Sequence, residues 1–158
     1  MATKSKAAEE LVTKFEMMPQ ESMVAVQHKK GKLFIGVPKE SSFQENRVAL
    51  IPEAVAVLVN RGHRVVIESK AGEGAKLYDT DYSEEGAEIA YNREEVFKAD
   101  IILKCAPLRE EELNLLKLNQ VIISPIHLPT MKPEILRKIM DKKITALAFE
   151  YIQVAASS

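Results

Sequence analysis

Short apolar runs alternate with helical patterns along residues 32–152, and this alternation constrains the fold more than any other feature. The six runs predicted to be strands are residues 32–37, 63–69, 88–91, 100–106, 119–126 and 143–152. The five segments predicted to be helices are residues 52–62, 79–87, 92–99, 108–117 and 132–142. Strands that alternate with helices form parallel βαβ units, whose sheet is covered on both faces. The sequence therefore predicts an α/β fold, an open, doubly wound and mostly parallel sheet.

The first 31 residues differ from the rest. Residues 4–18 carry apolar side chains at helical spacing, and Pro19 ends that pattern. We interpret residues 1–31 as a helical appendage with a linker, and residues 32–158 as the α/β domain. Because the chain stops directly after its last predicted strand, we expect this domain to be truncated before a further domain.

The composition excludes several classes of protein. The 22 basic and 23 acidic side chains nearly cancel, which argues against a nucleic-acid-binding surface. No apolar run reaches the roughly 20 residues of a membrane span, so we expect no membrane partner. The single cysteine, Cys105, rules out an internal disulfide framework and favours a reducing, cytoplasmic location.

In a doubly wound sheet, ligands bind beyond the carboxyl ends of the strands. Three cationic or titratable side chains are expected at that edge: Arg47 and His127 in loops that follow strands, and Lys104 at the end of the apolar run of residues 100–104. Arg47 could clamp a carboxylate with its planar fork, or pair with Glu45 or Glu40 as a surface charge. Lys104 could bind an anion or be an ordinary lysine at a strand end. His127 could move a proton or hydrogen-bond a carbonyl, or be a half-buried histidine bonded to the backbone.

Other motifs are weaker. The stretch "AGEGAKLY" contains Gly72 and Gly74, but it lacks the third glycine of a dinucleotide fingerprint, whose place is taken by Leu77. We therefore interpret the two glycines as turn residues with positive φ. No Cys/His cluster suggests a metal site, and no cofactor-binding residue is predicted in this chain.

Several longer stretches resemble a known family. The stretches "ENRVALIP", "RGHRVVIESKAGEGA", "DYSEEGAEI", "ADIILK" and "KITALAFEYI" are similar to the N-terminal domain shared by alanine dehydrogenase and the alpha subunit of proton-translocating nicotinamide nucleotide transhydrogenase. The resemblance extends from about residue 33 to residue 152.

This resemblance implies a function. In alanine dehydrogenase the domain holds the substrate half of the site, and a second domain, absent from this chain, binds NAD. The family's carboxylate-binding arginine falls on Arg47 and its catalytic histidine on His127, with pyruvate or L-alanine as the small-molecule substrate. The full-length form would be a homo-oligomer that oxidatively deaminates L-alanine to pyruvate and ammonia, whereas this chain alone would be inactive.

The resemblance also leaves alternatives open. Where alanine dehydrogenases carry "LKVKEP", this chain reads "LKCAP", so Ala106 stands where the family has a second, substrate-binding lysine, and Lys104 matches only the first. Transhydrogenases carry a similar "LK-NAPL" but have tryptophan in place of His127. The alternatives are therefore a transhydrogenase domain, or a non-catalytic domain that binds a carboxylate.

Overall fold

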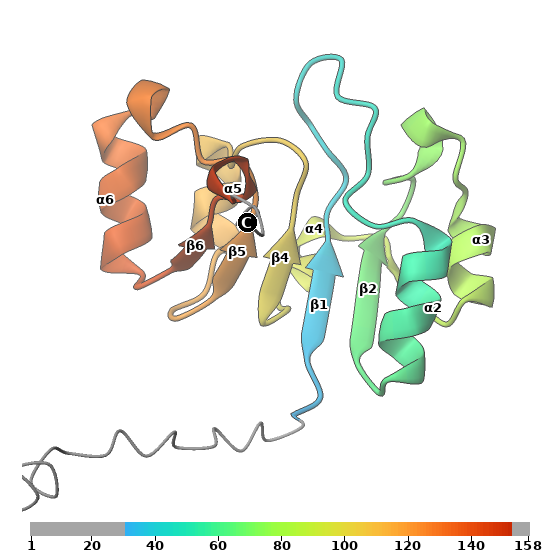
Figure 1. The fold of residues 1–158 in the computed structure, drawn as a ribbon. Helices are drawn as coiled ribbons and strands as arrows, with labels where there is room; N and C mark the ends of the chain where they lie inside the picture. Colours follow the sequence, from blue (N-terminus) through green and yellow to red (C-terminus); the bar gives the residue numbers. More distant parts are fainter. Residues whose placement is uncertain (1–30, 153–158) are drawn as a thin grey trace, which may run out of the picture. The chain divides into compact units, whose positions relative to one another are not determined.

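The computed structural model describes residues 31–152, which form one six-stranded sheet (Figure 1). All five strand pairs are parallel, and the strand order is β3-β2-β1-β4-β5-β6. The strands are β1 (Phe34–Val37), β2 (Arg64–Glu68), β3 (Glu88–Ala90), β4 (Ile101–Leu103), β5 (Val121–Ile123) and β6 (Thr145–Leu147). The predicted open, doubly wound parallel sheet is confirmed. The predicted appendage lies almost wholly outside the described residues.

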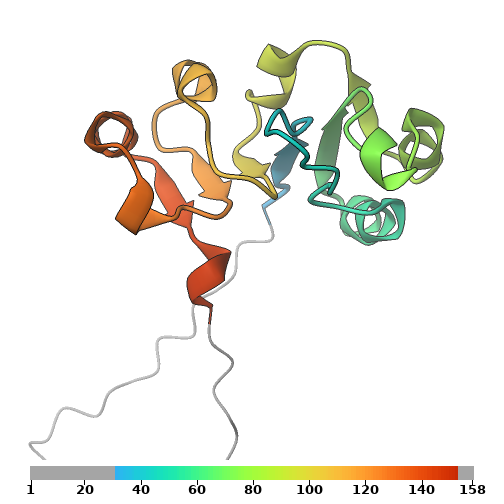
Figure 2. The ribbon, with the colours of Figure 1, turned by 90° about the horizontal axis from the view of Figure 1, so that it is seen from above.

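Helices cover the sheet on two faces. The α-helices are α2 (Pro52–Asn60), α3 (Asp79–Glu84), α4 (Arg93–Val96), α5 (Glu110–Leu115) and α6 (Pro133–Asp141). Seen from above, α2 lies on one side of the sheet and α4, α5 and α6 on the other (Figure 2). Pro52, the proline predicted at a helix start, is the first residue of α2. The N–H that proline lacks would have no partner within the helix at this position, so its absence costs nothing.

Each face of the sheet has its own apolar core. Ile35, Val37 and Ile67 pack with Val55 of α2 and Tyr82 of α3. The second core joins β4 and β5 to α5 and α6 through the buried residues Ile102, Leu113, Ile122 and Ile139. The central strands β1 and β2 are continuous apolar runs because consecutive residues, which point to opposite faces, are buried, whereas all three residues of the edge strand β6 are exposed.

Residues 31–152 also contain three short 3₁₀ turns: η1 (Glu73–Ala75), η2 (Leu128–Thr130) and η3 (Phe149–Tyr151). The last of these corrects the prediction of a strand that continues to residue 152. The chain leaves the sheet after Leu147 and turns, and this turn brings Glu150 back toward the loop that follows β5.

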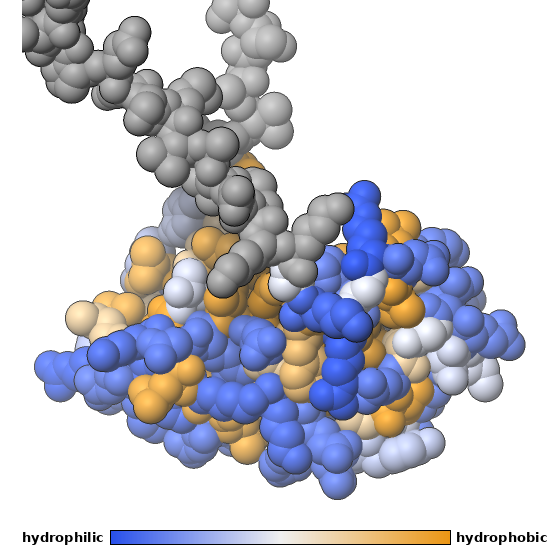
Figure 3. All heavy atoms as spheres, turned by 90° about the horizontal axis from the view of Figure 1, so that it is seen from below, coloured by the Kyte–Doolittle hydropathy of each residue, from blue (hydrophilic) through white to orange (hydrophobic). Residues whose placement is uncertain are grey.

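The strand order places a switch point between β1 and β4, because the chain runs outward from this pair in both directions. At such a point the loops after the two strands separate and leave a crevice at their carboxyl ends. The opposite edge, seen from below in Figure 3, shows mostly hydrophilic residues with apolar ones among them. In the part of the chain that the structure describes, no helix is long and apolar enough to cross a membrane.

Candidate functional site

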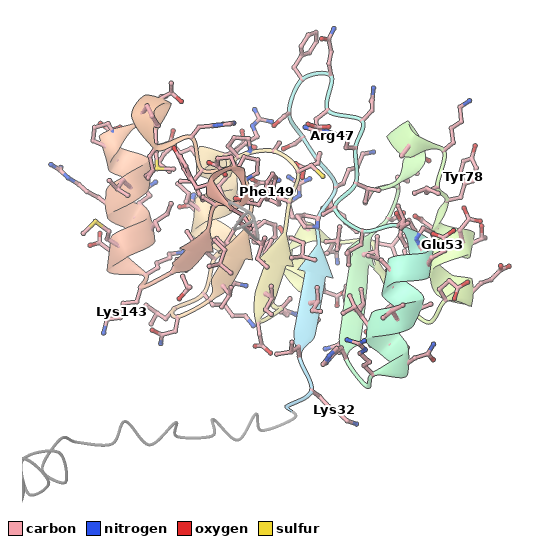
Figure 4. The ribbon with its side chains drawn as sticks, in the orientation of Figure 1. Lys32, Arg47, Glu53, Tyr78, Lys143 and Phe149 are labelled. Carbon is pink, nitrogen blue, oxygen red and sulfur yellow. The ribbon has the colours of Figure 1, made fainter. Side chains whose placement is uncertain are left out.

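A pocket of about 400 Å³ lies at the carboxyl edge of the sheet, a volume within the range of small-molecule sites. It is formed by the loops that follow β1, β4, β5 and β6. Figure 4 shows Arg47 and Phe149 at this edge, whereas Lys32 and Lys143 lie at the other. The residues that line it are Ser42, Phe43, Gln44, Glu45, Arg47, Cys105, Ala106, Pro107, Pro125, His127, Phe149 and Glu150.

Arg47 lies in this pocket with its guanidinium bound to Glu45. Its Nε donates to Oε1 at 2.8 Å and its Nη2 donates to Oε2 at 2.6 Å, which is the fork geometry that a ligand carboxylate would also require. The arginine side chain is 73% exposed. The hydrogen bond from the Arg47 side chain, joined by one from its backbone N–H, lowers the pKa of Glu45 to about 2. The pairing that the sequence offered as the alternative is therefore present in the structure.

The loop that carries Arg47 is anchored at both ends. At its start, the Glu68 carboxylate accepts the backbone N–H of Lys39 at 2.8 Å, and Arg93 donates to the Lys39 carbonyl at 2.8 Å. At its end, the Tyr82 hydroxyl donates to the carbonyl of Leu50 at 2.8 Å. Burial raises the pKa of Tyr82 to about 12, so this donor stays protonated at neutral pH. The position of Arg47 is thus set by side chains of β2, α3 and α4.

Gly74 lies against the loop that carries Arg47. The interpretation of Gly72 and Gly74 as turn residues with positive φ is wrong. Neither Gly72 nor Gly74 has a positive φ; in this segment Lys70 and Lys76 adopt that conformation. A Cβ at Gly74 would lie 2.9 Å from the Cα and the carbonyl oxygen of Asn46, the residue before Arg47. Glycine is needed at this position because the backbone of the Arg47 loop passes close to it.

His127 reaches the pocket from the loop after β5, so the structure brings it together with Arg47. Its backbone is left-handed, with φ 48° and ψ 50°. Its carbonyl accepts hydrogen bonds from the backbone N–H and the hydroxyl of Thr130, at 2.9 and 3.1 Å. Its exposed imidazole can donate or accept a proton toward a molecule in the pocket.

Lys104 precedes the lining residue Cys105 in the chain and is not itself one of the residues that line the pocket. Only 2% of the residue is exposed. Its ammonium donates to Glu40 at 2.8 Å and to Glu112 at 2.9 Å. A buried lysine is stabilised by such partners, and here both are carboxylates. Direct substrate binding by Lys104 stays a prediction, and this arrangement favours a supporting role.

Glu40, which binds Lys104, also connects two of the loops at the pocket. Its Oε1 accepts the backbone N–H groups of Cys105 and Ala106, at 2.6 and 3.3 Å, while Oε2 binds Lys104. The loop after β1 is thereby tied to the loop after β4, across the switch point. The Cys105 thiol is half-buried there, and desolvation, followed by the charge of Glu40, raises its pKa. The neutral thiol therefore predominates at neutral pH.

Glu150 is the pocket residue that sequence reasoning missed, because it was assigned to the interior of the last strand. Its carboxylate accepts the backbone N–H groups of Ile126 and His127. A charged residue within the apolar stretch "ALAFEYI" was the signal that could have identified it. Among residues 31–152, the structure contains no group of three or more histidine, cysteine or acidic side chains placed to hold a metal ion.

Comparison with known proteins relates this geometry to a family. Residues 36–158 match the family described as "Alanine dehydrogenase/PNT, N-terminal domain". The chain is 40% identical over 127 residues to an alanine dehydrogenase of Methanococcus maripaludis, covering 80% of this chain and 34% of that protein. It is 35% identical over 122 residues to one of Staphylococcus saprophyticus, covering 77% and 33%. The chain thus spans about a third of the length of these relatives.

Solved structures agree with this relationship. An L-alanine dehydrogenase superposes with a TM-score of 0.74 at 34% identity, covering 78% of this chain and 34% of that one. A transhydrogenase from Sinorhizobium meliloti superposes with a TM-score of 0.71 at 28% identity, covering 77% and 36%. The sheet, the pocket at its switch point and these matches lead to one conclusion: the chain belongs to the alanine dehydrogenase/PNT family and matches its N-terminal domain.

Proposed function

We propose that this chain is the substrate-binding domain of an NAD-dependent L-alanine dehydrogenase. One observation carries the proposal: Arg47 and His127 line the same pocket, in a chain 40% identical to an alanine dehydrogenase. The full protein would convert L-alanine, water and NAD⁺ to pyruvate, ammonium, NADH and a proton. NAD would be bound by a domain outside this chain and would accept the hydride from the substrate Cα.

In this proposal Arg47 binds the substrate carboxylate. A bidentate guanidinium fixes both the position and the orientation of a carboxylate. Glu45 occupies the guanidinium fork, so on binding the substrate carboxylate replaces the Glu45 carboxylate. The net cost of desolvating Arg47 is therefore small. His127 then hydrogen-bonds the oxygen or nitrogen on the substrate Cα and carries the proton that this atom gains or loses.

Lys104 has a supporting role in the same proposal. Its buried ammonium holds Glu40, and Glu40 holds the backbone of Cys105 and Ala106 at the pocket wall. Loss of Lys104 would therefore disturb the pocket without removing a group that touches the substrate. The proposed partners are a small keto or amino acid and, in the full-length form, further copies of the same protein, which sedimentation of that protein will test.

Titration of the 158-residue chain with pyruvate, followed by NMR, tests the substrate site. We expect the Arg47 side-chain N–H signal and the His127 imidazole signals to move, while the imidazole of His63, which accepts the Leu33 N–H and does not line the pocket, stays still. Arg47→Ala should abolish the response. Arg61→Ala, an exposed arginine at the end of α2, is the matched control and should retain it. Unmoved signals at both pocket residues in the unmodified chain would remove the proposal.

A second candidate is the corresponding domain of a transhydrogenase, favoured by the TM-score of 0.71 to such a protein. The two candidates differ in substrate. Formation of NADH from L-alanine and NAD⁺ by the protein that carries this domain and its nucleotide-binding domain would establish the dehydrogenase. Pyruvate binding without such turnover would instead leave a non-catalytic carboxylate-binding domain.

A further inference from the structure

Glu150 joins the loop after β6 to the loop after β5 through a single oxygen atom. Its Oε1 accepts the N–H of Ile126 at 2.7 Å and the N–H of His127 at 2.9 Å. These residues are 24 and 23 positions away in the sequence. The contact exists because the chain leaves β6 in the turn Phe149–Tyr151, which directs Glu150 back along the pocket wall.

This contact acts on a left-handed backbone, a conformation that few non-glycine residues adopt, although histidine does so more often than most. His127 is left-handed, and such residues persist only where their surroundings hold them in place. Here the N–H of His127 is bound by Glu150 and its carbonyl is bound twice by Thr130. The direction in which the Cα–Cβ bond leaves the backbone, and hence the approach of the imidazole to the pocket, depends on this conformation.

The Glu150 carboxylate is also held in its ionised form. Partial desolvation of this exposed side chain would raise its pKa, but hydrogen bonds from the N–H groups of His127, Ile126 and Glu150 itself, with the coulombic effect of His127, outweigh it and lower the pKa. An ionised carboxylate makes stronger hydrogen bonds to N–H groups than a neutral acceptor does. The His127 backbone is therefore restrained across the neutral pH range.

We propose that Glu150 is a positioning residue, which holds His127 in the left-handed conformation that presents the imidazole to the substrate carbonyl. This inference rests on the proposed function, since it assigns a role within the same pocket. One oxygen accepts both hydrogen bonds, and a glutamine side chain provides an oxygen at the same place. The position of this oxygen is thus the property that must be retained, and the negative charge strengthens the two hydrogen bonds without being required for them.

The test compares Glu150→Gln and Glu150→Ala with the unmodified chain in the pyruvate titration. We expect Glu150→Gln to keep the pyruvate-induced movement of the His127 imidazole signals. Glu150→Ala should lose that movement, so that His127 responds no more than His63, while the Arg47 signal still moves. The amide protons of Ile126 and His127 should exchange with solvent faster in Glu150→Ala than in Glu150→Gln. Glu84→Ala, at an exposed glutamate of α3, is the control and should change none of these signals.

Each result decides the inference. An unchanged His127 response in Glu150→Ala would overturn it, and so would an equal loss in both variants, since charge and not geometry would then matter. Glu150 is exposed, so both variants should fold, which circular dichroism will check. If pyruvate moves no signal in the unmodified chain, the proposed function fails and with it the role toward substrate. The amide exchange and the His127 Cα shift, measured without pyruvate, then report the backbone restraint separately.

Discussion

Arg47 and Glu45, two residues apart in the loop after β1, form a bidentate ion pair at the mouth of the pocket, with N–O distances of 2.8 and 2.6 Å. Glu45 occupies the fork that the proposed substrate needs. The pocket therefore contains an internal competitor for the proposed carboxylate site, which leads to the first two predictions.

Glu45→Gln should strengthen pyruvate binding. The amide keeps the size of the side chain but removes the charge that competes for Arg47. We expect the dissociation constant to fall by a factor of about two to five, because an exposed ion pair contributes little. The NMR titration measures it, and Glu84→Gln is the matched control. Weaker binding in Glu45→Gln would mean that Glu45 orients Arg47 for the substrate and does not compete with it.

The Glu45–Arg47 pair should persist to low pH. The pKa of Glu45 is lowered to about 2 by its hydrogen bonds with Arg47, below the roughly 4.3 of an unfolded glutamate. Since the folded pKa is the lower one, the pair contributes to stability above the unfolded pKa, and this contribution is lost as the pH falls through about 2. The Arg47 side-chain N–H signal should therefore stay constant from neutral pH to about pH 4. A transition centred near the unfolded pKa would show that the pair does not form in solution.

Lys104→Met should destabilise the domain strongly. It leaves the buried carboxylates of Glu40 and Glu112 without their shared cation, which should lower the free energy of unfolding by about 3 kcal/mol. Urea denaturation measures this. Lys138→Met is the control: it removes an exposed ion pair with Glu110 at 3.8 Å and should change the free energy of unfolding by less than about 1 kcal/mol.

The pyruvate titration separates the two roles of Lys104. If Lys104 supports the pocket only through Glu40, its own ammonium signal should not respond to pyruvate in the unmodified chain. A pyruvate-induced movement of that signal, in step with Arg47, would instead establish direct contact with the substrate.

Gly74→Ala should weaken pyruvate binding. The new Cβ would lie 2.9 Å from the Asn46 backbone, so the loop that carries Arg47 must shift. We expect roughly a tenfold loss of affinity, because small displacements of a positioning group have large effects. Gly62→Ala is the control: with φ +86° and no atom within 4 Å, it should cost about 1 kcal/mol of stability and leave the affinity unchanged. Equal affinity in both variants would show that the loop absorbs the extra methyl group.

The sequence by itself determined the parallel α/β class and the edge on which the site lies. Both follow from local information, because apolar runs and helical spacing are visible within short windows, and parallel strands end at one edge. Arg47 and His127 could be predicted as neighbours on that basis. The role of the glycine pair was misinterpreted because a glycine is required at position 74 by the close backbone of Asn46, 28 positions earlier in the sequence.

Only the tertiary structure decided the strand order, the burial of Lys104 and the position of Glu150. The contact between Lys104 and Glu40 joins residues 64 apart, and that between Glu150 and His127 joins residues 23 apart. No local pattern encodes such pairs, because the strength of a buried ion pair or a carboxylate–amide hydrogen bond depends on how chain segments meet in space and exclude water. The residue types at the pocket could be found from the sequence, whereas their partners depend on that three-dimensional packing.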